Sequence, residues 1–230
     1  MSLYLIINLL TIAAPLLLSF DKKVHFYTYF KGVFLGIVVM MLLFIPWDAY
    51  FTHIGIWGFN PNYLSGISLF KLPLEEWLFF ITVPFACTFI HEVFRAWFPQ
   101  FNPFKNVFKH LLIVLIITQL IVCIVFNKNY YTLTAFGLNS LFLIVILVKK
   151  AKWIPRFLLT YTVVIVPFLI VNGILTGGFT EEPVVWYNND HNLGIRVFTI
   201  PIEDFMYNLL MLGIVIGVHE SRKRSFLNKK

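Results

Sequence analysis

Two stretches of the chain, PLEEWLFFITVPFACTFIHE at residues 73–92 and PIEDFMYNLLMLGIVIGVHE at residues 201–220, follow one pattern. Each opens with P-x-E-[ED], continues through an apolar run and ends in His-Glu. Proline followed by acids is typical of a helix N-terminus, and the apolar run is long enough to cross the hydrocarbon core of a bilayer. The two stretches therefore predict two membrane helices that are copies of one another.

The similarity extends outward from these stretches at one constant spacing along the chain. This spacing is the number of residues from Pro73 to Pro201, and we call it the repeat offset. It places Phe51-Thr52 on Phe179-Thr180, Gly66-Ile67 on Gly194-Ile195, and Phe70 on Phe198. Such a register indicates an internal duplication. We predict a first three-helix repeat at residues 1–98, a linker with one helix at 99–130, and a second three-helix repeat at 131–230. With one helix between them, the repeats are expected to lie parallel in the membrane.

The composition indicates that lipid surrounds most of the chain. Of the 230 residues, 59% are hydrophobic and only 13% are charged, whereas soluble domains are about a quarter charged. We predict an all-α integral membrane protein with about seven transmembrane helices, the fifth being the shortest. The predicted spans are about 3–20, 32–50, 74–94, 108–126, 132–148, 156–175 and 202–219.

The basic residues predict the orientation. All but three of the 18 Lys and Arg residues, namely Lys71, Lys128 and Arg196, fall on one side of the seven-span topology. By the positive-inside rule that side is cytoplasmic. We therefore expect a multi-pass protein of the cell (inner) membrane, with its N-terminus and its two long loops outward and its C-terminus cytoplasmic. The net positive charge then needs no nucleic-acid partner.

Four acidic residues open the two copied helices: Glu75, Glu76, Glu203 and Asp204. The alternative interpretation is that they only stabilise helix N-termini. Two observations favour a functional role: the motif recurs in both repeats, and apolar residues surround it. Phe80 and Asn208 lie one turn further along the faces of Glu76 and Asp204. Four carboxyls near an apolar cavity would repel, so we expect at least one to keep its proton and act as a Brønsted acid.

The two long loops and the adjoining helix ends carry further polar and aromatic residues. The polar ones are Asp48, Asn60, Glu181, Glu182 and Asn188; the aromatic ones are Trp57, Phe59, Trp186 and Tyr187. As interfacial residues they would be ordinary, and such rings commonly form an aromatic belt. In a site that handles a cationic intermediate, the same rings would stabilise positive charge through their π faces.

The His-Glu pairs that end the copied stretches lie roughly 25 Å along each helix from the first acids. Glu92 has Arg95 three residues later, and Glu220 has Arg224 four residues later. This spacing predicts interfacial ion pairs with a structural role. Gly32-x-x-x-Gly36 predicts close helix packing.

Several motifs are absent from the sequence. It has no G-x-G-x-x-G, no P-loop, no H-E-x-x-H and no Asp-rich magnesium motif. Its two cysteines, Cys87 and Cys123, lie in apolar runs. We therefore expect no cofactor and no metal.

The tandem P-x-E-E-W-x-F-F and P-x-E-D-F-x-Y-N motifs, preceded by GIWGFNP and TEEPVVWYN, resemble the small membrane lycopene cyclases of bacteria and archaea. In some members of that family the two three-helix halves are separate chains. The resemblance implies cyclisation of lycopene to β-carotene through the monocyclic γ-carotene, without nicotinamide or flavin. The reaction is an isomerisation that needs an acid, a base, aromatic walls and no water.

Under this resemblance the four acids at positions 75, 76, 203 and 204 would supply acid and base. Side chains that orient the acids or bind substrate would be Asn60, Asn188, Asn208, Asp48, Glu181, Glu182, Trp57, Phe59, Trp77, Phe80, Trp186 and Tyr187. The expected partners are lycopene or a related linear carotenoid, the lipid bilayer and other carotenoid-pathway enzymes. Because Asp204 stands where the first repeat has Glu76, the two repeats need not be equivalent.

Three alternatives stay open from the sequence. A 3+1+3 bundle is also the architecture of small sugar transporters, although the middles of the two copied helices are almost wholly apolar. A non-enzymatic carotenoid- or lipid-binding subunit would need the acids only as helix starts. An ε-ring product or a longer carotenoid substrate would keep the chemistry but change its outcome.

Overall fold

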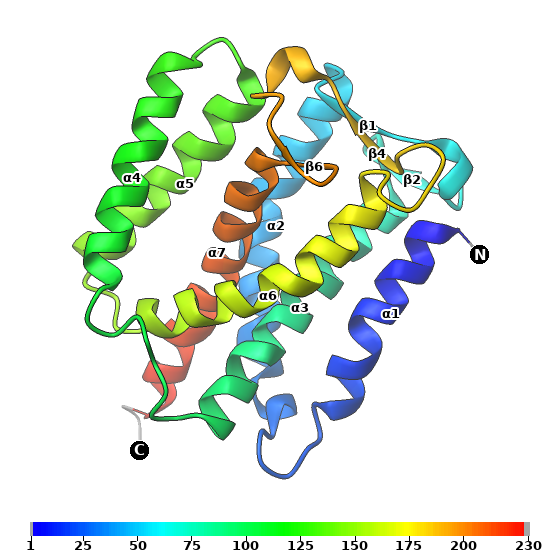
Figure 1. The fold of residues 1–230 in the computed structure, drawn as a ribbon. Coiled ribbons are helices and arrows are strands. Elements are labelled where there is room, and N and C mark those ends of the chain that lie inside the picture. The colour runs from blue at the N-terminus through cyan, green and yellow to red at the C-terminus, as the bar shows by residue number, and fades with distance from the viewer. Residues whose placement is uncertain (1, 228–230) are drawn as a thin grey trace. The chain divides into compact units, whose positions relative to one another are not determined.

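The computed structural model describes residues 2–227, and it consists mainly of α-helices (Figure 1). Within that range the α-helices are α1 (Leu3–Leu18), α2 (Phe30–His53), α3 (Leu74–Trp97), α4 (Phe108–Val125), α5 (Tyr130–Val148), α6 (Ile154–Leu175) and α7 (Ile202–Leu227). A 3-10 helix, η1 (Phe26–Tyr29), precedes α2. Six of the helices are long and apolar enough to cross a membrane, and α1 is a shorter apolar helix. The chain is therefore an all-α, multi-pass membrane protein.

The helices lie where the hydropathy of the sequence places them. Each predicted span overlaps one of α1 to α7. The prediction that the fifth span is the shortest is wrong, because α5 has 19 residues and α1 has 16. Ser2 caps α1, accepting a hydrogen bond from the Leu5 N–H, and Ser19 follows its last turn.

The two long loops have the same local structure. The first contains β1 (Trp57–Phe59), η2 (Pro61–Tyr63), β2 (Ser68–Leu69) and β3 (Leu72–Pro73), and the second contains β4 (Val185–Tyr187), η3 (Asn189–His191), β5 (Arg196–Val197) and β6 (Ile200–Pro201). Every element of the second loop begins one repeat offset after its counterpart. A left-handed backbone conformation at Phe70 (φ 52°) recurs at Phe198 (φ 56°). Because left-handed phenylalanine is uncommon, this agreement supports the inferred duplication.

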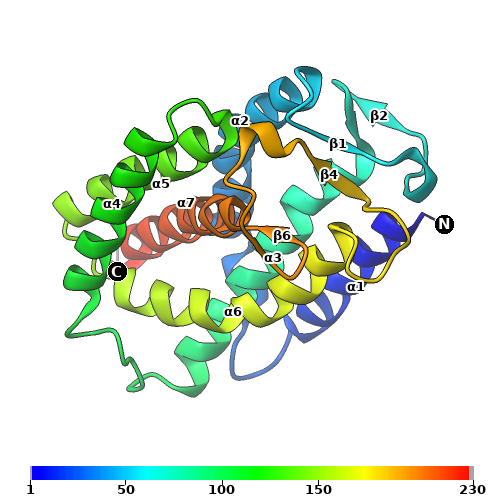
Figure 2. The same cartoon turned by 45° about the horizontal axis from the view of Figure 1, so that its top comes forward.

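The strands β1 and β4 join the two loops to each other. They pair antiparallel, with Trp57 opposite Tyr187 and Gly58 opposite Trp186 (Figure 2). Gly58 and Trp186 are themselves one repeat offset apart, so each copy of this strand meets its own counterpart. A side chain at Gly58 would collide with the indole ring of Trp186, and only glycine fits there without a shift.

The chain divides into two compact units. Of the described residues, unit 1 contains 2–50, 61–101 and 211–227, and unit 2 contains 51–60 and 102–210. Both units draw on both predicted repeats, so the repeat boundaries at residues 98 and 130 stay predictions.

Each unit has its own helix pairs. In unit 1, α1 lies along α3, and in unit 2, α4 lies along α5 (Figures 1 and 2). The predicted close packing at Gly32 and Gly36 is confirmed in unit 1. A Cβ atom at Gly36 would come within 2.6 Å of the Val215 carbonyl oxygen of α7, and one at Gly32 within 3.2 Å of His219 Nδ1.

Candidate active site

The first acid of each motif ties a loop to a helix. In unit 1, Oε1 of Glu75 accepts hydrogen bonds from the Ser2 hydroxyl and from the Ser65 N–H, both at 2.6 Å. Ser2 opens α1, and Ser65 belongs to the loop that leads into α3. The Glu75 side chain is fully buried, so these two bonds hold its carboxyl rigidly.

The same arrangement recurs in unit 2. Oε1 of Glu203 accepts from the Thr132 hydroxyl at 2.6 Å and from the Leu193 N–H at 2.8 Å. Leu193 stands one repeat offset after Ser65, so the same loop position is tethered in both repeats. Within residues 2–227, Oε2 of Glu75 and Oε2 of Glu203 are buried and have no hydrogen-bond partner. Unpaired buried polar atoms are rare in folded proteins, and here the same atom of the first acid is unpaired in both motifs.

The second acid of the first motif, Glu76, accepts a hydrogen bond from the hydroxyl of Tyr4 on α1, at 2.5 Å. In unit 1, phenylalanine rings lie one turn further along α3. Phe80, one turn below it, is fully buried, and its ring lies 6.1 Å from the ring of Phe44. Phe79 packs its ring edge-on against Tyr4. The Glu76 carboxyl therefore sits above a packed apolar layer.

The second acid of the second motif, Asp204, lies between two tyrosines. Tyr131 donates to Oδ1 of Asp204 at 2.5 Å, and Tyr187 donates to Oδ2 at 2.9 Å. Tyr131 comes from the start of α5, Tyr187 from β4 and Asp204 from the first turn of α7. Both carboxyl oxygens of a 5% exposed aspartate are thus hydrogen-bonded, and three separate elements of unit 2 fix its position.

Aromatic rings surround the Asp204 carboxyl. Trp57 of β1 packs edge-on against Tyr131, with ring centroids 4.9 Å apart, and Tyr131 stacks on Tyr187 at 5.8 Å. Tyr207 lies 6.3 Å from Trp57. The β1–β4 pairing explains this arrangement, since it sets Trp57 opposite Tyr187. These rings present π faces and edges beside the acid, which suits a site where positive charge develops on carbon.

Asn208, one turn along α7 from Asp204, is 3% exposed. Its Oδ1 has no hydrogen-bond partner within the described part of the chain. The structure thus brings three predicted residues, Trp57, Tyr187 and Asn208, to the vicinity of Asp204.

The other predicted residues lie elsewhere. Asn60 donates to Glu182 at 2.8 Å in an exposed loop, and Glu181 is exposed beside it. Asn188 caps η3 by accepting from the Asp190 N–H. These residues build the loops rather than the buried surroundings of the acids.

Four more predicted residues are accounted for by local packing. Trp77 donates to the Leu69 carbonyl, and Trp186 is 42% exposed over Gly58. Phe59 lies in β1 opposite Val185. Asp48 is buried in α2, within unit 1.

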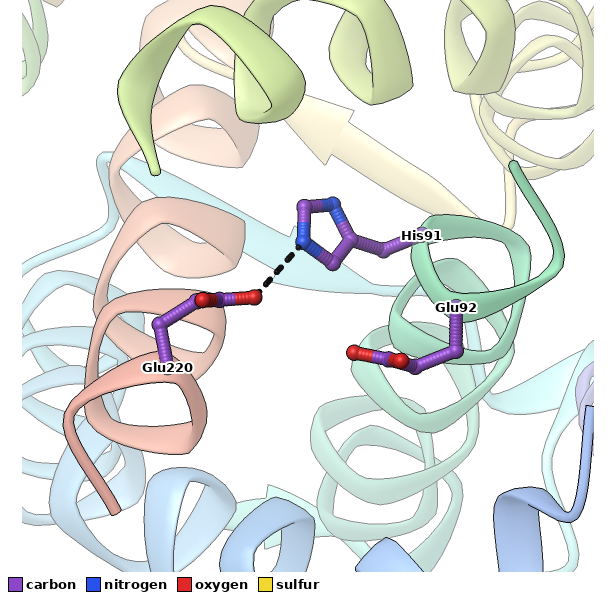
Figure 3. A group of neighbouring side chains, drawn as sticks. All are labelled: His91, Glu92 and Glu220. Atoms are coloured by element: carbon purple, nitrogen blue, oxygen red, sulfur yellow. Dashed lines mark hydrogen bonds and ion pairs between the residues drawn. The ribbon is translucent and has the colours of Figure 1, made fainter. Parts of the chain in front are cut away.

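A second polar cluster lies at the far ends of α3 and α7, in unit 1, and it is reciprocal. His91 of α3 pairs with Glu220 of α7 at 3.2 Å, and His219 of α7 pairs with Glu92 of α3 at 2.8 Å. Figure 3 shows the first of these pairs with Glu92 beside it. Each histidine therefore pairs with the glutamate of the other repeat.

Two basic residues complete the cluster with the same reciprocity. Arg95 forms an ion pair with Glu220, and Lys223 forms one with Glu92 at 2.8 Å. Lys223 stands one repeat offset after Arg95, so the motif is H-E-x-x-[RK]. The predicted Glu92–Arg95 pair is confirmed at 3.4 Å, whereas the side chain of Arg224 lies outside the described residues. The predicted structural role fits this closed network, in which two acids meet two bases.

The same cluster contains three groups with the spacing of metal ligands. His91, Glu92 and Glu220 offer ligand atoms within 4.8 Å of one another (Figure 3). Arg95 contacts all three of them. The guanidinium already supplies the positive charge that a cation would bring, so the group is not an open metal site.

The chain also matches a known protein family over most of its length. A family model described as "Lycopene cyclase" matches residues 1–94 and 127–221. The chain belongs to the lycopene cyclase family. The matched segments leave out residues 95–126, which include α4.

Curated relatives in the lycopene cyclase family are fungal proteins named "Bifunctional lycopene cyclase/phytoene synthase". The chain is similar to those of Aspergillus oryzae (30% identical over 26% of this chain and 10% of that one), Gibberella fujikuroi (34% over 32% and 12%) and Arthroderma gypseum (35% over 22% and 9%). The matches thus span only about a tenth of the length of these relatives. No solved structure matches the chain.

Sequence reasoning missed three tyrosines of this lycopene cyclase family member. Tyr4 and Tyr131 open the first helices of their repeats, where a tyrosine is ordinarily taken for a membrane-interface residue. Tyr207 lies within the second motif but three residues beyond its acid. The recurrence of a tyrosine near the start of both α1 and α5 was the signal available in the sequence.

Proposed function

We propose that this protein is a lycopene cyclase that converts the linear ends of lycopene into β-rings. Membership of the lycopene cyclase family supports the reaction class. The observation that carries the assignment of the site is Asp204, held between Tyr131 and Tyr187 beside Trp57. The reaction is an isomerisation, so the proposal includes neither a cofactor nor a metal.

The proposed reaction has three steps. The Asp204 carboxyl adds its proton to the terminal double bond of the substrate, which leaves a tertiary carbocation and the Asp204 carboxylate. The internal double bond of the same end group attacks that cation, and this closes a six-membered ring and moves the positive charge to the neighbouring carbon. Loss of a proton from the ring restores a double bond, and a carboxylate takes the proton up. Atoms and electrons balance, because one proton is added and one is lost.

The surroundings of Asp204 support each step. Burial keeps water from quenching the cation. The Tyr131 and Tyr187 hydroxyls stabilise the carboxylate left after proton transfer, since hydrogen bonds to a carboxylate favour its charged form. The Trp57 ring and the tyrosine rings stabilise the cation through their π electrons. Glu203, with its unpaired Oε2, is the proposed second proton acceptor.

The proposed setting is the cell membrane, with the acidic ends of α3 and α7 on the outward side and the basic C-terminal tail in the cytoplasm. The substrate would reach the site from the lipid. Because the curated relatives are named for both lycopene cyclase and phytoene synthase, the proposal includes contact with another carotenoid-pathway enzyme as a partner.

Expression in a lycopene-accumulating bacterial host tests the proposal. The red pigment is expected to turn yellow-orange, and chromatography is expected to show β-carotene. Asp204→Asn is expected to lower cyclisation by about 100-fold or more, the range of general acid catalysis, at unchanged protein level in the membrane. Asp190→Asn makes the same chemical change in an exposed loop and serves as the control. Persistent lycopene with confirmed membrane insertion would reject the function, and an ε-ring product would reject the β assignment.

A further inference from the structure

The surroundings of the second acid differ between the repeats more than the surroundings of the first. In the loops and in the third helix of each repeat, positions one repeat offset apart correspond. At these positions three polar residues of the second repeat have phenylalanine counterparts in the first: Tyr187 corresponds to Phe59, Tyr207 to Phe79 and Asn208 to Phe80. Phenylalanine has no hydrogen-bonding group, so the first repeat lacks at these positions the hydroxyls and the amide that the second provides.

The difference is clearest one helical turn after each acid, at Phe80 and Asn208. Phe80 is fully buried and packs against Phe44 and Phe79. Asn208 is smaller and polar, and its buried Oδ1 has no partner among the residues that the structure describes. A buried amide oxygen without a partner points to a group, such as a developing cation, that is absent from the folded chain itself. The first repeat has a packed phenylalanine at the corresponding sequence position.

We propose that the protein has a single cyclisation centre, at Asp204, and that both ends of the linear substrate are cyclised there in turn. This inference rests on the proposed lycopene cyclase function. Tyr131 and Tyr187 are positioning residues that hold the Asp204 carboxyl. Glu76 and Tyr4 hold α1 against α3 and are not required for ring formation.

A single centre fixes the order in which the two ends react. Each ring closure returns a proton to the Asp204 carboxylate, directly or through Glu203, so the centre is restored after the first end has reacted. The monocyclic product then has to leave the centre and present its other, still linear end. Free monocyclic product is therefore an obligatory intermediate, and fresh lycopene competes with it for the one centre.

The test compares the pattern of products rather than the total activity. Variants at matched positions are expressed in the lycopene-accumulating host, and linear, monocyclic and bicyclic pigments are measured by chromatography per amount of membrane-inserted protein. Glu76→Gln is expected to lower the rate several-fold by loosening α1, with the bicyclic product still the end point. Asp204→Asn is expected to remove both rings together.

A second matched pair keeps the carboxyls intact, in case Glu76→Gln does not fold. Tyr4→Phe and Tyr131→Phe each delete one hydroxyl that donates to the second acid of a motif. Tyr4→Phe is expected to keep the bicyclic end point. Tyr131→Phe is expected to slow both rings about tenfold, which corresponds to one hydrogen bond to a charged group, so that monocyclic and bicyclic products both appear later and in the same order.

Three results would overturn the single centre while leaving the cyclase function in place. Glu76→Gln or Tyr4→Phe protein that stops at the monocyclic product would indicate one centre per repeat. Loss of all rings in Glu76→Gln, at normal protein level and with Tyr4→Phe equally inactive, would make Glu76 part of the chemistry. Asp204→Asn protein that still forms one ring would show that the first repeat also takes part in ring formation. Wild-type protein that forms no ring at all would instead reject the proposed function itself.

Discussion

The starts of α3 and α7 have the same backbone support but different chemical surroundings. Glu75 and Glu203 each accept one hydroxyl and one loop N–H, and the two N–H groups correspond at the repeat offset. One residue further, Asp204 accepts from two tyrosine hydroxyls, whereas Glu76 accepts from the Tyr4 hydroxyl and has packed phenylalanines one turn further along its helix. Duplication thus preserved the element that fixes the loop to the helix, while the neighbouring position diverged.

The far ends of the same two helices provide the contrasting case. There the two repeats contribute equally, because each histidine and each base meets the glutamate of the other repeat. A contact that is shared between copies constrains both of them, whereas a site built within one copy is free to change in the other.

The largest effect on stability is expected at the reciprocal cluster. Glu92→Gln and Glu220→Gln each remove one acid from a buried network: the first takes the charge partner from Lys223, and the second leaves Arg95 with Glu92 alone. We expect each to lower the free energy of unfolding by about 3–5 kcal/mol, and the two losses to agree within about 1 kcal/mol. Titration with a denaturing detergent in mixed micelles measures this, with the exposed Glu182→Gln as control. Clearly unequal losses would show that the cluster is not symmetric in energy.

A smaller effect on stability, again equal in the two repeats, is expected at the hydrogen bonds of Glu75 and Glu203. Glu75→Gln and Glu203→Gln weaken the hydrogen bonds to the Ser2 and Thr132 hydroxyls and to the loop N–H groups. Each substitution is expected to lower the free energy of unfolding by about 1–3 kcal/mol, the range for disturbing a buried charged hydrogen bond. Since Glu203 is also the proposed second proton acceptor, only Glu203→Gln should reduce cyclisation beyond its loss of stability. Equal activity losses in the two variants would remove that role.

The smallest effect is expected where the repeats already differ. Tyr187→Phe copies Phe59 and deletes one hydroxyl from Asp204, so cyclisation should slow about fivefold, the equivalent of about 1 kcal/mol. The reverse change, Phe59→Tyr, should leave the ratio of monocyclic to bicyclic product unaltered. Chromatographic time courses measure both. A new or lost ring in Phe59→Tyr would show that the first repeat takes part in the chemistry.

Much of the fold was predictable because its determinants are local in the sequence. Apolar runs of membrane length placed all seven helices, and the P-x-E-[ED] motifs placed the starts of α3 and α7. The reciprocal cluster was partly predictable. The Glu92–Arg95 pair follows from i,i+3 spacing, but the pairing of Lys223 with Glu92 depends on contact between two helices.

The site was less predictable for the same physical reason. The acids were found from one motif, but Tyr131 reaches Asp204 from 73 residues away along the chain. Trp57 reaches Tyr187 only through the β1–β4 pairing, and such short strands have no recognisable pattern in a loop rich in aromatics. Contacts of this kind depend on tertiary structure, which spacing along one sequence does not encode.

The pairing of Gly58 with Trp186 makes the residue allowed in one repeat depend on the residue present in the other. The indole occupies the space that a side chain at position 58 would need. The absence of a side chain at Gly58 therefore leaves room for the Trp186 ring. A side chain at position 58 therefore calls for a smaller residue at position 186, so the two halves are expected to vary together at this crossing of strands.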